Sequence, residues 1–120
     1  MSISIGVALP EDATVAEALV TRTAALAERL SGRWVAFIFT ARNSMERADM
    51  VMRAGGTVFC YEPEDVAQAL VEIGRRERID LLILGTPRPN GFLARFRRDT
   101  TDRVIRAERP FDVVVFSTTI

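Results

Sequence analysis

Histidine and lysine are both absent from this chain of 120 residues, and cysteine occurs only once. The lack of histidine removes the commonest general base and metal ligand, and it excludes Ser-His and Cys-His nucleophile pairs. The lack of lysine excludes a P-loop lysine, a Schiff-base lysine and a lysine general base. Cys60 stands between Phe59 and Tyr61 in a strand-like run, where a lone cysteine is usually a small apolar filler. These absences predict that the chain is not an enzyme and holds no metal.

The chain also has no net charge and no long hydrophobic run. The 16 arginines balance 16 acidic residues, so the formal net charge is zero and a nucleic-acid partner is not expected. No apolar run is long enough to cross a membrane, and the first ten residues lack the basic start of a secretory signal. We therefore expect a cytoplasmic protein with no membrane insertion. Apolar residues make up 48% of the chain, which is enough for one domain over residues 1–120.

Apolar runs of strand length alternate with segments of helical period, which indicates an α/β fold with a parallel sheet and crossover helices. The predicted strands cover residues 3–9, 34–40, 57–61, 81–84 and 111–117. The predicted helices cover residues 13–30, 43–53, 63–78 and 100–107. Right-handed crossovers favour an open five-stranded sheet in the order 3-2-1-4-5 with helices on both faces. We expect the first and fourth helices on one face and the second and third on the other.

Local signals suggest where the helices begin. Thr14 and Glu17 have the spacing of a capping box for the first helix. Pro63 fits the first turn of the third helix, because proline needs no N–H partner there.

A basic segment follows the fourth predicted strand. Residues 86–98 contain two prolines and a glycine and have no sustained period, so they read as a long loop at the carboxyl end of that strand. Open parallel sheets bind ligands at this end. Arg88, Arg95, Arg97 and Arg98 could bind phosphate or carboxylate groups. The alternative is a solvated loop whose arginines pair with the acidic residues that follow.

Three stretches of the chain carry a family resemblance. Residues 83–116 (ILGTPRPNGFLARFRRDTTDRVIRAERPFDVVVF) join a strand, a basic loop and a helix containing Asp102 and Arg103. Residues 24–40 (AALAERLSGRWVAFIFT) and 62–85 (EPEDVAQALVEIGRRERIDLLILG) each join a helix to an apolar strand. All three resemble universal stress proteins, and most of all the universal-stress domain of KdpD-type potassium-sensor kinases. The resemblance implies a regulatory, stress-response domain that often forms homodimers.

The same resemblance bears on a bound nucleotide. ATP-binding members carry a spaced pattern of three glycines followed by Ser or Thr. Gly85 matches the first glycine, whereas Arg88, Arg98 and Asp99 stand at the other three positions, followed by Thr100. Side chains at the glycine positions would keep backbone N–H groups away from phosphate, and Asp99 would repel it. We therefore expect ATP to bind weakly or not at all, while ATP or AMP and cyclic dinucleotides stay open as cofactors.

Two further segments would border the same ligand. Ala8, Leu9 and Asp12 belong to the turn after the first strand, where the family approaches a nucleotide. Asp12 could bind a ribose hydroxyl, or it could instead begin the cap of the first helix. Phe39 and Thr40 end the second strand and could contact a base, or they could pack under the second helix.

The last strand is predicted to lie at an edge of the sheet. It is apolar and β-branched, and past Pro110 it has no proline or lysine to protect an edge. Two copies could pair there about a twofold axis. The residues expected in this homodimer interface are Asp112, Val113, Val114, Val115 and Phe116.

Three functions remain open from the sequence. The chain could be a regulatory domain that binds a nucleotide-like anion. It could instead be a ligand-free interaction module that acts through a regulatory protein partner or its own dimer. The third function, a nucleotide-dependent enzyme of a related α/β fold, requires a Ser/Gly-rich phosphate loop after the first strand, which residues 8–12 (ALPED) lack.

Overall fold

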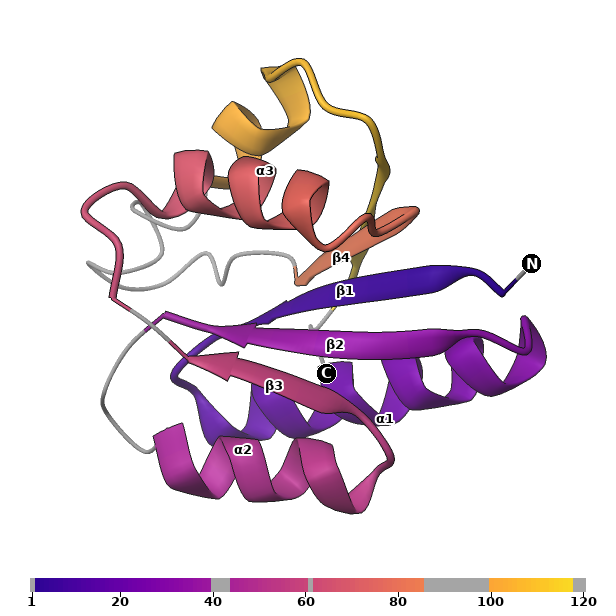
Figure 1. Ribbon diagram of the computed structural model, residues 1–120. Coiled ribbons are helices and arrows are strands. Elements are labelled where there is room, and N and C mark those ends of the chain that lie inside the picture. Colours follow the sequence, from indigo (N-terminus) through magenta and orange to yellow (C-terminus); the bar gives the residue numbers. More distant parts are fainter. Residues whose placement is uncertain (1, 40–43, 61, 86–99, 118–120) are drawn as a thin grey trace.

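The computed structural model describes residues 2–39, 44–60, 62–85 and 100–117 (Figure 1). In this part of the chain, one parallel sheet has five strands in the order β3-β2-β1-β4-β5, which confirms the predicted order. The strands are β1 (Ser4–Leu9), β2 (Arg33–Ile38), β3 (Thr57–Cys60), β4 (Leu81–Gly85) and β5 (Asp112–Phe116). β1 therefore lies at the centre of the sheet, and β3 and β5 form its edges.

Helices connect these strands. They are α1 (Ala13–Arg29), α2 (Ser44–Arg53) and α3 (Val66–Arg76), and residues 100–106 are also helical. Each lies within a few residues of a predicted helix. In the part of the chain that the structure describes, none of the helices has both the length and the apolar character needed to cross a bilayer.

The distribution of the helices over the two faces differs from the prediction. Leu19 of α1 and Val51 of α2 share one buried cluster, whereas Leu70 of α3 and Val104 share the other. Figure 1 shows α1 and α2 together on the face opposite α3. A right-handed crossover changes face when the chain reverses its direction across the sheet. The chain moves one way through β1, β2 and β3 and the other way through β4 and β5, so the predicted pairing of the first helix with the fourth was wrong.

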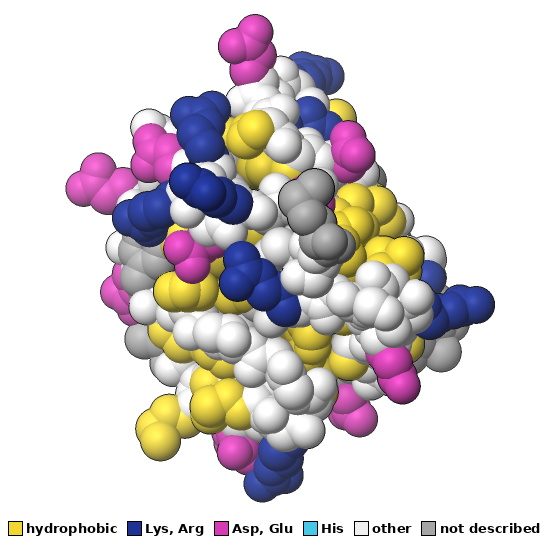
Figure 2. All heavy atoms as spheres, turned by 45° about the vertical axis from the view of Figure 1, so that its right-hand side comes forward, with side chains coloured by type: hydrophobic (Ala, Val, Ile, Leu, Met, Phe, Trp, Pro, Cys, Tyr) yellow, Lys and Arg dark blue, Asp and Glu magenta, His cyan; other side chains and the backbone are white. Residues whose placement is uncertain are grey.

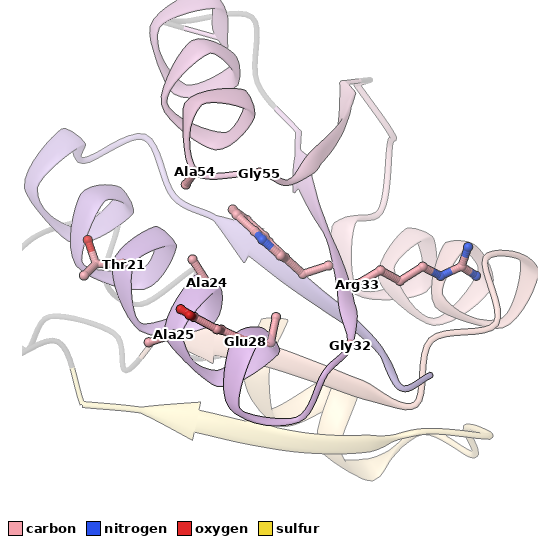
Figure 3. Close-up of a pocket in the computed structure, with 10 residues that line it drawn as sticks. Thr21, Ala24, Ala25, Glu28, Gly32, Arg33, Ala54 and Gly55 are labelled. Carbon is pink, nitrogen blue, oxygen red and sulfur yellow. The ribbon is translucent and has the colours of Figure 1, made fainter. Parts of the chain in front are cut away.

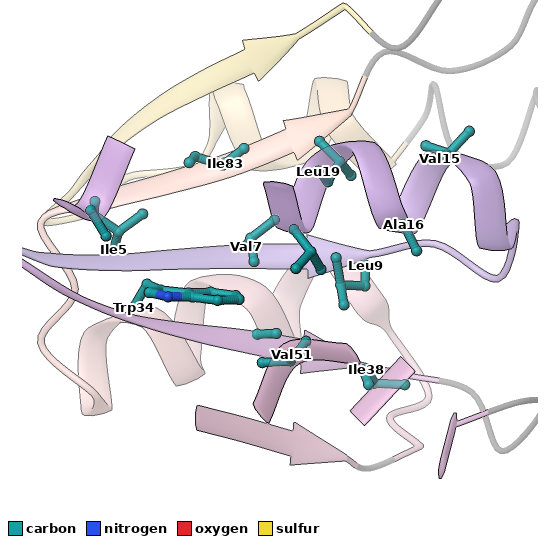
Figure 4. Close-up of a cluster of buried hydrophobic side chains, with 13 residues drawn as sticks. Ile5, Val7, Leu9, Val15, Ala16, Leu19, Trp34, Ile38, Val51 and Ile83 are labelled. Carbon is teal, nitrogen blue, oxygen red and sulfur yellow. The ribbon is translucent and has the colours of Figure 1, made fainter. Parts of the chain in front are cut away.

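The central strand is packed on both faces. Ile5, Val7 and Leu9 point into the cluster beneath α1 and α2 and are at most 4% exposed (Figure 4). Gly6 faces the other side, where an added Cβ would lie 2.7 Å from a ring carbon of Phe37. A side chain at position 6 would therefore collide with the Phe37 ring unless the ring moved.

The helix caps correct two predictions. Asp12, and not Thr14, caps α1, since its Oδ1 accepts hydrogen bonds from the N–H groups of Thr14 (3.0 Å) and Val15 (3.1 Å). Asp65 caps α3 by accepting from Gln68 N–H at 3.2 Å, so Pro63 lies before the first turn. In both cases a short carboxylate satisfies the free N–H groups of the first turn better than the predicted residue could.

The predicted apolar role of Cys60 was also wrong. Its side chain is exposed, as are those of Thr57 and Phe59 on the same strand. β3 is an edge strand, and Val58 is its residue that packs against the cluster beneath α1 and α2. A strand-like sequence does not reveal whether the strand is central or at an edge, and this decides the burial of Cys60.

Candidate functional site

The strand order creates a switch point between β1 and β4. These strands are neighbours, with Ile5 paired to Leu81 and Val7 to Ile83. The chain leaves the carboxyl end of β1 toward β2 and leaves that of β4 toward β5, on the opposite side. Open α/β sheets bind ligands where the connections diverge in this way. We refer to the carboxyl ends of β1 and β4 with the turns that leave them as the switch point.

The structure describes about half of the predicted ligand-binding residues. It places three of them where β1 and β4 end, one beside the end of β2, one at the start of α1 and one in the helix of residues 100–106: Ala8, Leu9, Gly85, Phe39, Asp12 and Thr100. The remaining predictions lie outside the described residues: Thr40, Arg88, Arg95, Arg98 and Asp99. The structure thus brings the predicted residues of β1, β2 and β4 together at the carboxyl end of the sheet.

The side chains of two of these residues pack in the core. Leu9 is 4% exposed and points into the cluster beneath α1 and α2. Phe39 is half-buried, packs against the opposite cluster, and stacks on Phe37 with 6.4 Å between ring centroids. Leu9 can therefore offer a ligand only its backbone. Phe39 therefore packs in the core, but on the α3 face of the sheet and not under α2, so the packing interpretation made from the sequence was wrong about the face.

Asp12 has the role of a helix cap, as one of the two sequence interpretations held. Its two hydrogen bonds to backbone N–H groups occupy donors at the start of α1 that an anion would otherwise use. The beginning of α1 is thereby less suited to phosphate. A ribose contact from Asp12 stays a prediction.

Arg47 is the residue near the switch point that the sequence reasoning missed. It lies on α2, is 1% exposed, and its Nη1 donates hydrogen bonds to the carbonyl oxygens of Leu9 (3.3 Å) and Pro10 (3.1 Å). The guanidinium thus fixes the turn that leaves β1 against α2. The sequence contained a signal for this, because Arg47 and Val51 are four residues apart and share the inner face of the helix.

Arg103 joins the helix of residues 100–106 to α3. Its Nη2 lies 2.6 Å from Oδ2 of Asp65. The Arg103 hydrogen bond, followed by that from Gln68 N–H, holds the pKa of Asp65 below its ordinary value of 3.8. The arginine of the predicted Asp-Arg pair therefore anchors the helix that follows the basic segment.

This pair predicts a pH-dependent stability. Because the pKa of Asp65 is lowered on folding, the pair stabilises the fold above pH 3.8, and the effect is lost as the pH falls below that value. Asp65→Asn keeps a capping side chain but removes the charge. We expect its melting temperature to lie below that of the unmodified protein at about pH 6, and the difference between the two to shrink as the pH falls below 3.8. Asp102→Asn is the matched control, and an equal effect of both variants would contradict the assignment.

Charge is mixed on the surface seen in Figure 2. Acidic and basic side chains are interspersed there, with apolar side chains between them. Among the described residues, no group of three or more His, Cys, Asp or Glu side chains is placed to hold a metal ion.

The fold is shared with solved structures. A universal stress protein in complex with cAMP superposes with a TM-score of 0.69 at 18% identity, covering 98% of both chains. The universal stress protein UspA from Lactobacillus plantarum gives 0.63 at 16% identity, covering 95% of this chain and 97% of that one. A universal stress protein from Archaeoglobus fulgidus in complex with dAMP gives 0.62 at 15% identity, covering 94% and 96%.

This chain has the universal-stress-protein fold. The likeness covers almost the whole length of each of these proteins, so the fold is matched as a complete domain. No family model matches the sequence, and no curated protein matches it. The finer resemblance to the KdpD-type domain therefore stays a prediction.

Proposed function

We propose that this protein is a non-catalytic regulatory domain of the universal-stress type that binds a nucleotide-like anion at the switch point. The observation that carries the proposal is the sheet order, which makes β1 and β4 neighbours and sends the chain away from them in opposite directions. Two proteins of the same fold are described in complex with the adenine nucleotides cAMP and dAMP. Both of these nucleotides carry a single phosphate.

The residues of this chain favour a monophosphate over ATP. Arg88 and Arg95 of the basic segment would supply guanidinium groups to one phosphate. Arg98 and Asp99 stand where the ATP-binding pattern has Gly and Ser or Thr, so backbone contacts to a triphosphate would be lost. Asp12 already occupies N–H groups at the start of α1. AMP, cAMP and cyclic dinucleotides are therefore better candidates than ATP.

A regulatory role fits this chemistry better than catalysis. The chain has no histidine or lysine to act as a general base or to hold a transferred group. The turn after β1 offers Pro10 and two acidic residues, Glu11 and Asp12, in place of a phosphate-binding loop. Binding without turnover would let nucleotide occupancy control a partner.

The basic segment is tested by removing its charge. Replacing Arg88 and Arg95 together by Gln is expected to abolish AMP or cAMP binding in a calorimetric titration. The melting temperature should change by no more than a few degrees, since surface ion pairs contribute about 0–1 kcal/mol each. The matched control replaces Arg75 and Arg76, which are exposed on α3, by Gln. Unchanged binding after the loop substitutions would contradict the proposal, as would an equal loss in the control.

A second candidate function is an interaction module that works through β5. This strand is at an edge, and one side of its backbone has no neighbouring strand among the described residues. Val115 is 39% exposed there. A homodimer on β5, or a regulatory protein that covers the same edge, would satisfy those backbone groups. The two functions are compatible, because the open edge of β5 lies on the side of this strand that is away from β4.

A further inference from the structure

A groove runs between α1 and α2 on the face opposite α3. It consists of two adjoining hollows of about 590 and 580 Å³ that share Thr21 and Ala54. We call it the α1/α2 groove. Its walls come from one face of each helix: Glu17, Thr21, Ala25 and Glu28 of α1, and Glu46 and Asp49 of α2. Of these residues, only Glu17 was given a role from the sequence, as part of the capping box, and the groove is distinct from the switch point.

The middle of the groove is lined by small side chains over a fixed aromatic floor. Ala24, Ala25 and Ala54 line it beside Gly55 (Figure 3). Trp34 also lines it and is 6% exposed. Small side chains allow the backbone of a docked segment to approach closely. The floor is therefore shaped for a regular backbone.

The Trp34 ring has little freedom to move. A Cβ added at Gly56 would lie 2.7 Å from two of its ring atoms, so the turn after α2 packs directly against the indole. The ring also belongs to the cluster beneath α1 and α2. The floor is thus preformed, and binding would not require the core to rearrange.

The charge along the groove is negative. Glu17, Glu28 and Glu46 are exposed, and within the described ranges the structure gives none of them an ion-pair partner. The positive charge of Arg53 is paired with Asp49 at 2.8 Å. Arg33 also belongs to the lining, but Figure 3 shows its side chain directed away from Ala24 and Glu28. An occupant with positive charges on both flanks would complement this arrangement.

We propose that the α1/α2 groove binds a basic amphipathic helix of a partner protein. Glu17 and Glu28 are eleven residues apart, so at 1.5 Å per residue the groove is about 16 Å long, or three helical turns. A helix with an apolar stripe of small residues would pack on the floor formed by Ala24 and Trp34. Arg or Lys on the flanks of that helix would pair with Glu17, Glu28 and Glu46. Helix-in-groove docking of this kind uses anchors at helical spacing.

The outer surface of α2 adds apolar area next to the groove. Met45 is 85% exposed and Met52 is 59% exposed, and seven residues separate them on the same face of the helix. Methionine is common on surfaces that bind helices, because its side chain adapts to the partner.

The test uses three labelled synthetic peptides of about fourteen residues. The first has an Ala/Leu stripe flanked by arginines, the second is a scrambled version with the same composition, and the third carries Glu in place of Arg. We expect saturable fluorescence anisotropy at about 0.15 M salt for the first peptide alone. Amide chemical shifts should change along α1 and α2 and not at β5.

Removing charge at two different places then distinguishes docking in the groove from general ionic attraction to the protein surface. Replacing Glu17 and Glu46 by Gln should weaken the binding of the first peptide at least about tenfold. The same loss of charge at Glu62 and Glu64, which precede α3 and are also exposed, should leave it unchanged. Equal binding of the scrambled peptide, an equal effect of the control substitutions, or shifts confined to another surface would overturn the proposal, as would no saturable binding of the first peptide. Because adenine nucleotides are absent from these assays, their outcome is independent of the proposed nucleotide site.

Discussion

Replacing Arg47 by alanine is expected to lower the free energy of unfolding by about 3 kcal/mol. The substitution removes a buried, charged donor from the carbonyl oxygens of Leu9 and Pro10 and leaves a cavity beside α2. For a domain of this size the melting temperature should fall by roughly 10–20 °C. Thermal and urea unfolding followed by circular dichroism would measure both quantities.

Arg53 provides the matched control for this prediction. It lies on the same helix, but its side chain is 81% exposed, and its ion-pair partner among the described residues is Asp49 at i–4. We expect Arg53→Ala to change the free energy of unfolding by less than about 0.5 kcal/mol. Similar losses for both variants would show that Arg47 does not hold the turn after β1.

A proline at position 115 is expected to convert a homodimer of this protein into a monomer. The N–H of Asp112 donates to the carbonyl of Asp80 at 3.1 Å, so Asp112 directs its N–H toward β4. Successive residues of a strand point to opposite neighbours. The backbone N–H of Val114 therefore also points toward β4, whereas the N–H groups of Val113 and Val115 point to the open edge. Val115→Pro removes one donor that only an edge-to-edge dimer would use.

Light scattering at tens of micromolar is the measurement for this second prediction. The unmodified protein should give about twice the monomer mass of 13.4 kDa, and the Val115→Pro variant about that mass itself. Val114→Pro is the control, since it should destabilise the sheet by breaking a bond to β4. A monomer without any substitution, or a dimer that tolerates Val115→Pro, would exclude pairing through this edge.

One contact already limits how two β5 strands could pair. Arg22 of α1 donates to the carbonyl oxygen of Ser117 at 3.1 Å, and its guanidinium lies 4.1 Å from the centre of the Phe116 ring. The carboxyl end of the strand is therefore partly covered by α1. Pairing should centre on Val113 and Val115, which is narrower than the interface predicted from the sequence.

Much of the fold could be predicted from the sequence because the strands are apolar runs separated by helical periods. The run around Phe37 is buried on both faces, and such runs indicate central strands of parallel sheets. The distribution of the helices over the two faces follows from the predicted strand order and right-handed crossovers, so the wrong pairing of helices came from applying that rule incorrectly. The sequence offered both Asp12 and Thr14 as the cap of the first helix, and only the backbone geometry selects Asp12.

The candidate site was less predictable. Its location follows from strand order, and the order was predicted correctly. The role of Arg47 was missed, because an arginine in a short helix is normally solvent-exposed, and only the packing of α2 against the end of β1 buries it. The α1/α2 groove was missed for a related reason, since it depends on two helices that share one face of the sheet.

Whether the switch point binds a nucleotide is tested by a calorimetric titration of the unmodified protein with AMP, cAMP and ATP. We expect saturable binding of a monophosphate, and for ATP a dissociation constant above about 100 μM, because each lost backbone contact to phosphate costs about 1–1.5 kcal/mol. Substituting Arg98→Gly and Asp99→Ser together should tighten ATP binding. Micromolar affinity for ATP in the unmodified protein, or no binding of any of the three nucleotides, would contradict the account.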